Sequence, residues 1–273
     1  MPIRTFAALA PLALALAGCS SPEDVSDELG ITETGQASAS ATAAATGEAK
    51  SVEEENDLYM FAYSYPAQVG AIPALAARLD ADAKKAKAAL IEQSEDDREQ
   101  AQENDYPYRA HSFSEEWKVV ADLPRFLSLS GEFATYTGGA HGMYGLETLV
   151  WDRQADTGVE GVGLFQSAQA LNDALGPKLC DALDAERAER RGEPVVRGGA
   201  EDIAGFDSCQ HVEDATVLVG SSNGETFDRI GIWFGPYVAG AYAEGAYELN
   251  FPVDAAVIEA VKPEYRDAFA ARR

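Results

Sequence analysis

An apolar leader at the N-terminus decides which part of the chain can fold and in which compartment. Arg4 is the only charged residue before a run rich in Ala and Leu, which extends from Phe6 to Ala17. This run is shorter than the ~20 apolar residues of a membrane-spanning helix, and a positive charge before a short apolar run is typical of a secretory signal peptide. We therefore assign residues 1–18 to a signal peptide and expect the folded body to lie outside the cytoplasm.

The leader ends at a cysteine, in the sequence Leu16-Ala17-Gly18-Cys19. Small residues before a cysteine resemble the lipobox, in which diacylglycerol is attached to the thiol and cleavage makes that cysteine the new N-terminus. An ordinary signal peptide that happens to contain a cysteine is the alternative. A single acyl chain anchors a protein only marginally, so we expect Cys19 to be triacylated. Ser20 follows it, which by resemblance to Gram-negative lipoproteins favours the periplasmic face of the outer membrane.

The leader is followed by a polar segment of low complexity. Residues 19–57 are mostly Ser, Ala, Thr, Gly and Glu, with few large apolar side chains, so we expect a disordered acidic tether. The folded body begins near Leu58 and holds roughly 215 residues, enough for one sizeable core or two packed subdomains. We divide it into an N-terminal strand–helix part, 58–110, and a C-terminal α+β part, 111–265, with a tail at 266–273.

Three cysteines are present, and Cys19 is assigned to the lipid. Cys180 and Cys209 remain as an even pair in an oxidising compartment, which predicts a disulfide between them. Such a bridge would close a loop of about 30 residues and stabilise the fold by ~3 kcal/mol. Metal ligation or a reactive thiol is the alternative, although the sequence has no Cys-x-x-Cys spacing.

The chain is strongly acidic. It carries 46 Asp and Glu residues against 21 Lys and Arg, a formal net charge of −25. Nucleic acid is excluded as a partner, because a phosphate backbone requires a basic surface. An acidic surface attracts basic proteins, basic peptides or divalent ions. The alternative is that the acidity serves solubility alone.

Apolar periodicity predicts a mixed set of elements. Two helices are expected, one from Ile72 to Leu90 and one that begins after Ser167 and breaks at Gly176-Pro177, and a short third helix is expected at 254–261. Alternating patterns predict strands at 58–65, 111–122, 125–137, 146–152, 216–220, 229–234 and 246–251. The order of these elements predicts an α+β fold, an antiparallel sheet packed with a few helices.

The sequence offers no convincing catalytic or metal centre. Gly220-Ser-Ser-Asn-Gly224 fits the spacing of a nucleophile elbow, but it lies between two strands, and no histidine follows His211 as that family's order requires. His111 and His141 are isolated, and a weak zinc candidate of Cys209, His211 and Glu213 would lose its sulfur ligand to the disulfide. We therefore expect no catalytic residues, no metal and no cofactor. The many carboxylates leave open a pair for glycoside hydrolysis.

One segment gathers residues suited to a binding loop, Tyr136-Thr-Gly-Gly-Ala-His-Gly-Met-Tyr-Gly145. Glycine permits positive φ and close backbone approach. The candidate binding residues are Gly138, Gly139, His141, Tyr144 and, from a second Gly/Tyr-rich segment, Tyr237. The alternatives are a tight hairpin locked by the imidazole of His141, and a Tyr237 that packs in the core.

These two segments carry a family resemblance. Together with Leu149–Asp152 and Gly163–Phe165, the segments Tyr136–Gly145 and Ile232–Gly245 make the chain from Leu58 to Val261 resemble the DUF3298/DUF4163 superfamily of envelope proteins. That superfamily includes the extracellular lysozyme-binding domain of an anti-sigma factor and accessory domains of peptidoglycan deacetylases. The resemblance implies an α+β module that binds a ligand. The chain shows neither a catalytic deacetylase domain nor, after the leader, a membrane-spanning segment.

The combined expectation is a lipid-anchored envelope protein without enzymatic activity. Its expected partner is a basic protein such as lysozyme or a peptidoglycan fragment, and its membrane contact is the lipid on Cys19. An enzyme acting on envelope polysaccharide and a structural or assembly lipoprotein are the alternatives.

Overall fold

The computed structural model describes residues 47–199 and 205–271. The expected signal peptide, the expected lipidation site Cys19 and most of the expected tether lie outside the described residues. Within the described part, no helix is both long enough and apolar enough to cross a membrane.

A six-stranded sheet forms the first half of the fold. It runs in sequence order through β1 (Lys50–Glu55), β2 (Tyr59–Tyr65), β3 (His111–Asp122), β4 (Phe126–Tyr136), β5 (Met143–Asp152) and β6 (Thr157–Val159). All neighbouring strands are antiparallel except β2 and β3, which are parallel because helix α3 connects them. The α+β class is confirmed, and the expected antiparallel sheet is in fact mixed.

The first strand corrects the predicted tether. β1 lies inside the range assigned to the tether and pairs antiparallel with β2 from Lys50↔Tyr65 to Glu55↔Met60. Its sequence, Lys-Ser-Val-Glu-Glu-Glu, is polar because an edge strand needs few apolar residues, and Val52 packs against the core. Composition alone misses such a strand, since its hydrogen-bonding partner is supplied by the aromatic β2.

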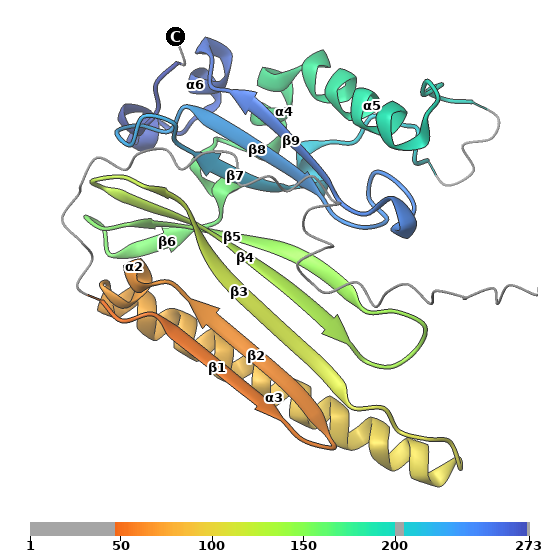
Figure 1. Ribbon diagram of the computed structural model, residues 1–273. Coiled ribbons are helices and arrows are strands. Elements are labelled where there is room, and N and C mark those ends of the chain that lie inside the picture. The colour runs from red at the N-terminus through yellow and green to blue at the C-terminus, as the bar shows by residue number, and fades with distance from the viewer. Residues whose placement is uncertain (1–46, 200–204, 272–273) are drawn as a thin grey trace, which may run out of the picture. The chain divides into compact units, whose positions relative to one another are not determined.

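A long helix covers one face of this sheet. The short α2 (Ala67–Gly70) leads into α3 (Pro73–Glu103), which begins at Pro73, confirms the predicted helix and continues through the charged stretch that follows Leu90. Figure 1 shows α3 running along the sheet behind β1 and β2. Leu75, Leu79 and Leu90 of α3 pack on apolar side chains of the sheet, including Phe61, Tyr63, Trp117, Leu129 and Leu149. Because β2 and β3 pair across the proposed boundary at 110/111, the two parts share one sheet.

The second half contains a smaller sheet and most of the helices. Its elements are η1 (Gly161–Leu164), α4 (Ala168–Leu175), α5 (Pro177–Arg191), η2 (Val212–Asp214), β7 (Thr216–Gly220), β8 (Arg229–Phe234), η3 (Tyr242–Glu244), β9 (Tyr247–Pro252), α6 (Ala255–Ala260) and η4 (Pro263–Ala268). β7, β8 and β9 form an antiparallel sheet in that order. The Ser167 hydroxyl accepts from Ala170 N and caps α4, and the break at Gly176-Pro177 separates α4 from α5 as predicted.

The end of the chain also differs from the expectation. Residues 266–273 were assigned to a tail, but Phe269 is buried and forms a bridge with Phe227. The same core holds Phe126 and Val150 of the large sheet together with apolar residues of β7, β8, β9, α4 and α5. The large sheet therefore contributes to two cores, one with α3 and one with the smaller sheet.

Candidate functional site

The loop between β4 and β5 requires glycine at its tip. Gly138 and Gly139 have φ of 90° and 86°, a region that residues with a side chain rarely adopt. No atom lies within 4 Å of the position that a Cβ would occupy at either residue. The backbone conformation of the turn, rather than lack of space, explains both glycines.

The two Gly/Tyr-rich segments meet around Tyr242, a residue that sequence analysis did not single out. The ring centroid of His141 lies 4.0 Å from that of Tyr242, with an angle of 22° between the planes. The centroids of Tyr144 and Tyr237 lie 6.3 Å and 5.5 Å from it. We call these four residues the aromatic surface. The only sequence signal for Tyr242 is its position within the second Gly/Tyr-rich segment.

Hydrogen bonds join the two segments across about a hundred positions of sequence. The Tyr242 hydroxyl donates to Gly142 O at 2.9 Å, and Ala246 N donates to the Tyr144 hydroxyl at 3.0 Å. His141 Nδ1 lies 2.9 Å from Gly142 O. The imidazole thus helps to lock the loop and also presents its ring beside Tyr242.

Two tyrosines of the aromatic surface remain open to solvent. Tyr237 is 49% exposed and Tyr144 is 36% exposed, so Tyr237 does not pack in the core. Tyr237 has φ of 68°, a left-handed conformation that costs a non-glycine residue roughly 1–2 kcal/mol. Backbone strain of this kind clusters at ligand-contacting sites, which makes Tyr237 the strongest contact candidate.

Helix α5 holds the second segment in place through its arginines. The fully buried Arg187 donates from Nε to Ala239 O at 2.9 Å and from Nη1 to Ser208 O at 3.0 Å. Arg190 Nη1 donates to Glu244 O and to Ala246 O, each at 2.7 Å. Arg191 Nη2 lies 3.0 Å from the Glu244 carboxylate. Most of these contacts are made to backbone carbonyls on either side of Tyr242.

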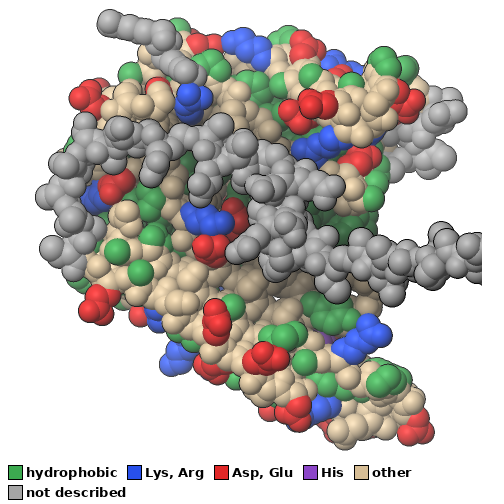
Figure 2. Space-filling view, in the orientation of Figure 1, with side chains coloured by type: hydrophobic (Ala, Val, Ile, Leu, Met, Phe, Trp, Pro, Cys, Tyr) green, Lys and Arg blue, Asp and Glu red, His purple; other side chains and the backbone are tan. Residues whose placement is uncertain are grey.

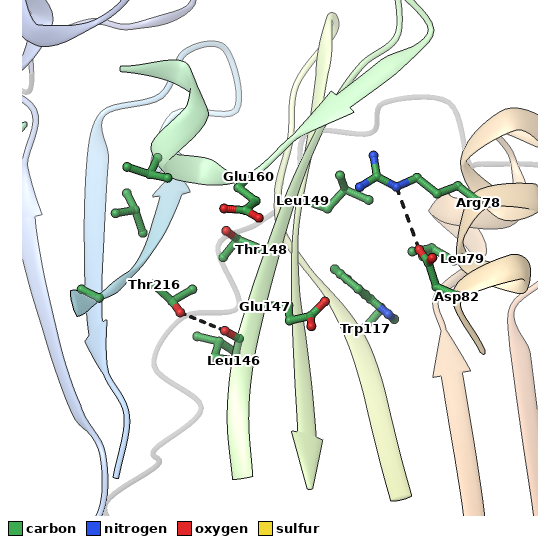
Figure 3. Close-up of a pocket in the computed structure, with 13 residues that line it drawn as sticks. Arg78, Leu79, Asp82, Trp117, Leu146, Glu147, Thr148, Leu149, Glu160 and Thr216 are labelled. Carbon is green, nitrogen blue, oxygen red and sulfur yellow. Dashed lines mark hydrogen bonds and ion pairs between the residues drawn. The ribbon is translucent and has the colours of Figure 1, made fainter. Parts of the chain in front are cut away.

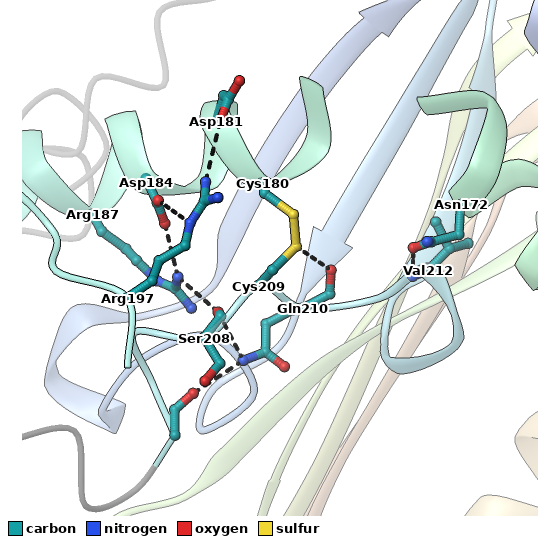
Figure 4. Close-up of a disulfide and its surroundings, with 11 residues drawn as sticks. Asn172, Cys180, Asp181, Asp184, Arg187, Arg197, Ser208, Cys209, Gln210 and Val212 are labelled. Atoms are coloured by element: carbon teal, nitrogen blue, oxygen red, sulfur yellow. Dashed lines mark hydrogen bonds and ion pairs between the residues drawn. A yellow bond between two sulfur atoms is a disulfide. The ribbon is translucent and has the colours of Figure 1, made fainter. Parts of the chain in front are cut away.

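The predicted disulfide is present and lies beside this arginine cluster. Cys180 of α5 is bonded to Cys209, with their Cα atoms 5.2 Å apart, and Figure 4 shows Arg187 and Ser208 next to the bridge. Arg197 Nε contacts Asp184 at 2.6 Å and ties the segment after α5 back to the helix. The bridge therefore fixes Ser208, an acceptor of Arg187, to the same helix.

A pocket of about 260 Å³ opens next to β5, between α3 and the η1–β7 region. Figure 3 shows Arg78 and Asp82 reaching it from α3, and Glu147, Thr148 and Glu160 bordering it from the opposite side. Its lining residues are Arg78, Leu79, Asp82, Trp117, Leu146, Glu147, Thr148, Leu149, Glu160, Val162, Ala215, Thr216 and Val217.

The pocket exists because β6 is short. β6 pairs only with Val150–Asp152, so within residues 47–199 and 205–271 no strand pairs with the preceding residues of β5 on that side. Side-chain hydrogen bonds hold that edge instead: Thr216 Oγ1 donates to Leu146 O at 2.9 Å, and Gly161 N donates to Thr148 Oγ1 at 3.1 Å. The gap between these contacts and α3 is the pocket.

A buried carboxylate adjoins the pocket wall. Glu115 of β3 is 8% exposed. Burial, followed by the charges of Glu147 and Asp82, raises its pKa to about 7. Burial and the charge of Asp82 also raise the pKa of Glu147. Sequence reasoning could not select these residues from 46 acidic ones, since only the alignment of β3, β4 and β5 brings them together.

The remaining histidines and the Gly-Ser-Ser-Asn-Gly segment do not join either site. His111 is buried, with Nε2 3.4 Å from Asp97 Oδ2, and His211 precedes η2. Ser222 lies in the turn between β7 and β8, where its N and Oγ both donate to the buried Asp228. Among residues 47–199 and 205–271, no three His, Cys, Asp or Glu side chains are grouped so as to hold a metal ion.

Charge is distributed over the surface rather than gathered in one patch. Figure 2 shows acidic side chains over both halves of the face in view, with Lys and Arg side chains between them. Ion pairs such as Lys50–Asp80 at 2.6 Å and Lys178–Asp254 at 2.7 Å neutralise part of the acidity locally. On the face in view, acidic and basic side chains are therefore interspersed.

The first half of the fold matches a known family. Residues 52–144, from β1 to the start of β5, match the family model described as "Deacetylase PdaC". Over these residues the match agrees with the superfamily resemblance drawn from the sequence, and it crosses the expected boundary at 110/111.

Solved structures of the DUF3298 family are similar at low identity. A member from Bacteroides fragilis NCTC 9343 is 15% identical with a TM-score of 0.47, covering 76% of this chain and 90% of that one. A protein from Pseudomonas aeruginosa PAO1 is 15% identical with a TM-score of 0.47, covering 83% of this chain and 98% of that one. No curated protein matches the sequence.

Proposed function

We propose that this chain is a lipid-anchored binding module of the cell envelope, which captures a basic protein such as lysozyme or a peptidoglycan fragment on its aromatic surface. The observation that carries the proposal is the meeting of the two Gly/Tyr-rich segments around Tyr242, with Tyr237 and Tyr144 left exposed. Lipid on Cys19 would hold the module at the periplasmic face of the outer membrane.

The aromatic surface has the chemistry of a binding site. Tyrosine presents a large apolar ring with a polar tip and loses little conformational entropy on binding, so it is enriched in contacts that dominate affinity. Here the rings are fixed beforehand by hydrogen bonds between the segments and by the arginines of α5. Fixing a site before binding lowers the entropic cost of association.

The acidity of the chain supports a cationic partner. A formal net charge of −25 would speed the approach of a basic protein, and this attraction would weaken as salt is added. A peptidoglycan fragment would instead contact the faces of the aromatic rings in the aromatic surface. Residues 52–144 match the model "Deacetylase PdaC". The superfamily that the chain resembles includes accessory domains of peptidoglycan deacetylases, which supports an envelope ligand.

A direct binding assay distinguishes the two candidate ligands. The secreted chain carrying Cys19→Ala is immobilised and challenged with lysozyme and with purified muropeptides at about 0.15 M salt, where long-range charge effects are screened. Retention of lysozyme together with inhibition of its activity supports the protein partner, and retention of muropeptides supports the glycan. If neither is retained, the proposal is wrong.

The pocket favours a second candidate function, hydrolysis of envelope polysaccharide. A carboxyl with a pKa of about 7 beside a second carboxylate resembles the pairing that glycosidases use for acid–base catalysis. Glu115 would be the acid and Glu147 the second carboxylate. Release of new muropeptides by the purified chain, abolished by Glu147→Gln, would establish this function in place of capture.

A further inference from the structure

The pocket beside β5 has no role in binding at the aromatic surface, and its charge is unbalanced. Asp82, Glu147 and Glu160 line it together with a single cation, Arg78. That guanidinium is already engaged, with Nη1 donating to Gly158 O at 3.2 Å and Nε 4.0 Å from Asp82 Oδ2. Three carboxylates therefore line the pocket. Arg78, which already contacts Gly158 and Asp82, is the only cation among the lining residues.

Glu115 adds a fourth carboxylate on the same face of the sheet, next to the lining residue Trp117 and outside the lining itself. Gly131 of β4 is the register partner of both Trp117 and Glu147, two lining residues. A Cβ on Gly131 would lie 2.9 Å from the Trp117 indole and 3.0 Å from Glu115 Oε1, so the carboxylate and the indole edge both cover this glycine. Glu115 thus projects on the face of the sheet that carries Trp117 and Glu147.

The Glu115 carboxylate lacks a partner. The residue is 8% exposed, and within the described part of the chain neither a hydrogen bond nor a salt bridge reaches its carboxylate. Burying a carboxylate without a donor is unfavourable, and native proteins rarely leave such a group unsatisfied. A donor that enters the adjoining pocket would satisfy it.

The shape of the pocket selects the kind of cation. No three carboxylates of the described residues converge as metal ligands do, which disfavours a divalent ion held directly by the protein. A volume of about 260 Å³ lies just below the range of roughly 300–1,000 Å³ that is usual for drug-sized ligands. The space therefore suits one side chain, and the Trp117 indole in its wall suits a cation.

We propose that this pocket receives the cationic side chain of a Lys or Arg residue from a partner protein. Glu147 would contact the charged head, Asp82 and Glu160 would lie on either side of it, and Glu115 would add negative charge from the sheet behind the pocket. This inference rests on the proposed function and makes the basic protein, rather than the glycan, its ligand.

The test uses the secreted chain carrying Cys19→Ala and a capped tetralysine peptide as the probe. Its Nε-acetylated form, which has the same length without the charges, and a glucosamine tetramer, which carries amines on a glycan, are compared by calorimetry at about 0.15 M salt. Glu147→Gln and Glu115→Gln remove one pocket carboxylate each. Glu116→Gln and Glu132→Gln are matched controls, since these exposed residues of β3 and β4 lie on the opposite face and change the net charge equally.

We expect tetralysine to bind at least about tenfold more tightly than its acetylated form, because a charge-assisted hydrogen bond contributes about that much. Glu147→Gln and Glu115→Gln should each weaken binding about tenfold, and the two control variants by less than about twofold. Equal losses in pocket and control variants would show that only the overall charge attracts the peptide, and would overturn the proposal. Binding of the glucosamine tetramer without the peptide would overturn it in favour of an amino sugar.

Failure of the pocket proposal can be distinguished from failure of lysozyme capture. If lysozyme is not retained but tetralysine binds through Glu147, the pocket stands and the named partner is wrong. If lysozyme is retained and Glu147→Gln leaves its affinity unchanged, the aromatic surface stands and the pocket proposal falls.

Discussion

At the scale of single residues, the two sites depend on side chains held in unfavourable settings. Tyr237 keeps a left-handed backbone conformation while half of its surface is exposed, and Glu115 is a carboxylate buried without a partner among the described residues. The sequence identified Tyr237 because it lies in a Gly/Tyr-rich segment. It could not identify Glu115, whose setting is created by Gly131, Trp117 and Glu147 on neighbouring strands.

Glu115 should lower the stability of the fold as the pH rises. Its folded-state pKa of about 7 lies above the ordinary 4.5, so the folded state binds the proton more tightly than the unfolded state. Stability is then highest below the unfolded pKa, falls as the pH rises towards 7 and stays low above it. Glu115→Gln should therefore raise the free energy of unfolding by on the order of 3 kcal/mol at about pH 8, and little at about pH 4.5.

Urea denaturation of both chains at several pH values measures this difference. Glu116→Gln is the control, because Glu116 is exposed on the same strand and its substitution should change stability by less than about 0.5 kcal/mol. A Glu115→Gln chain that is less stable than the parent chain at the higher pH would mean that the carboxylate has a stabilising partner.

At the scale of elements, local signals located most helices and strands, and long-range pairing decided the rest. The break between α4 and α5 follows from Gly176-Pro177, and β3 occupies the residues that its alternating pattern predicted. β1 and the buried end around Phe269 were missed, because a short polar strand and a C-terminal aromatic become ordered only through β2 and Phe227. The meeting of the two Gly/Tyr-rich segments also had no local signal.

The disulfide should stabilise the element that holds the second Gly/Tyr-rich segment. Cys180 and Cys209 are 29 residues apart, and a loop of that size corresponds to about 3–4 kcal/mol in the chain-entropy model. Replacing both cysteines with serine should lower the free energy of unfolding by about that amount, measured by denaturant titration. The parent chain under reducing conditions should show the same loss, and an unchanged transition in both would contradict this role.

At the scale of the whole molecule, the two proposed binding sites and the expected anchor would all serve capture of a partner at the envelope. Both sites involve β5, but Tyr144 and Glu147 are three residues apart on that strand, so their side chains point to opposite faces of the sheet. The net charge of −25 would favour the approach of such a partner if it is basic.

The expected anchor makes a separate prediction. Cys19→Ala should release the protein from the membrane fraction into the periplasm without changing its fold, because lipid on that residue is the only membrane contact that we propose. Cell fractionation measures the first effect, and circular dichroism of the purified chain measures the second. Persistence in the membrane fraction would point to another attachment, and loss of structure would mean that the N-terminal segment contributes to folding.

The central claim is that the aromatic surface binds the partner, and Tyr237→Gly tests it most directly. Glycine accepts the φ of 68°, so this variant should be at least as stable as the parent chain, while the exposed ring is lost. Lysozyme affinity, measured by calorimetry, should fall about tenfold or more, whereas Tyr106→Ala, which removes another exposed tyrosine, should leave it within about twofold. Unchanged affinity in a folded Tyr237→Gly chain, or an equal loss in Tyr106→Ala, would contradict the account.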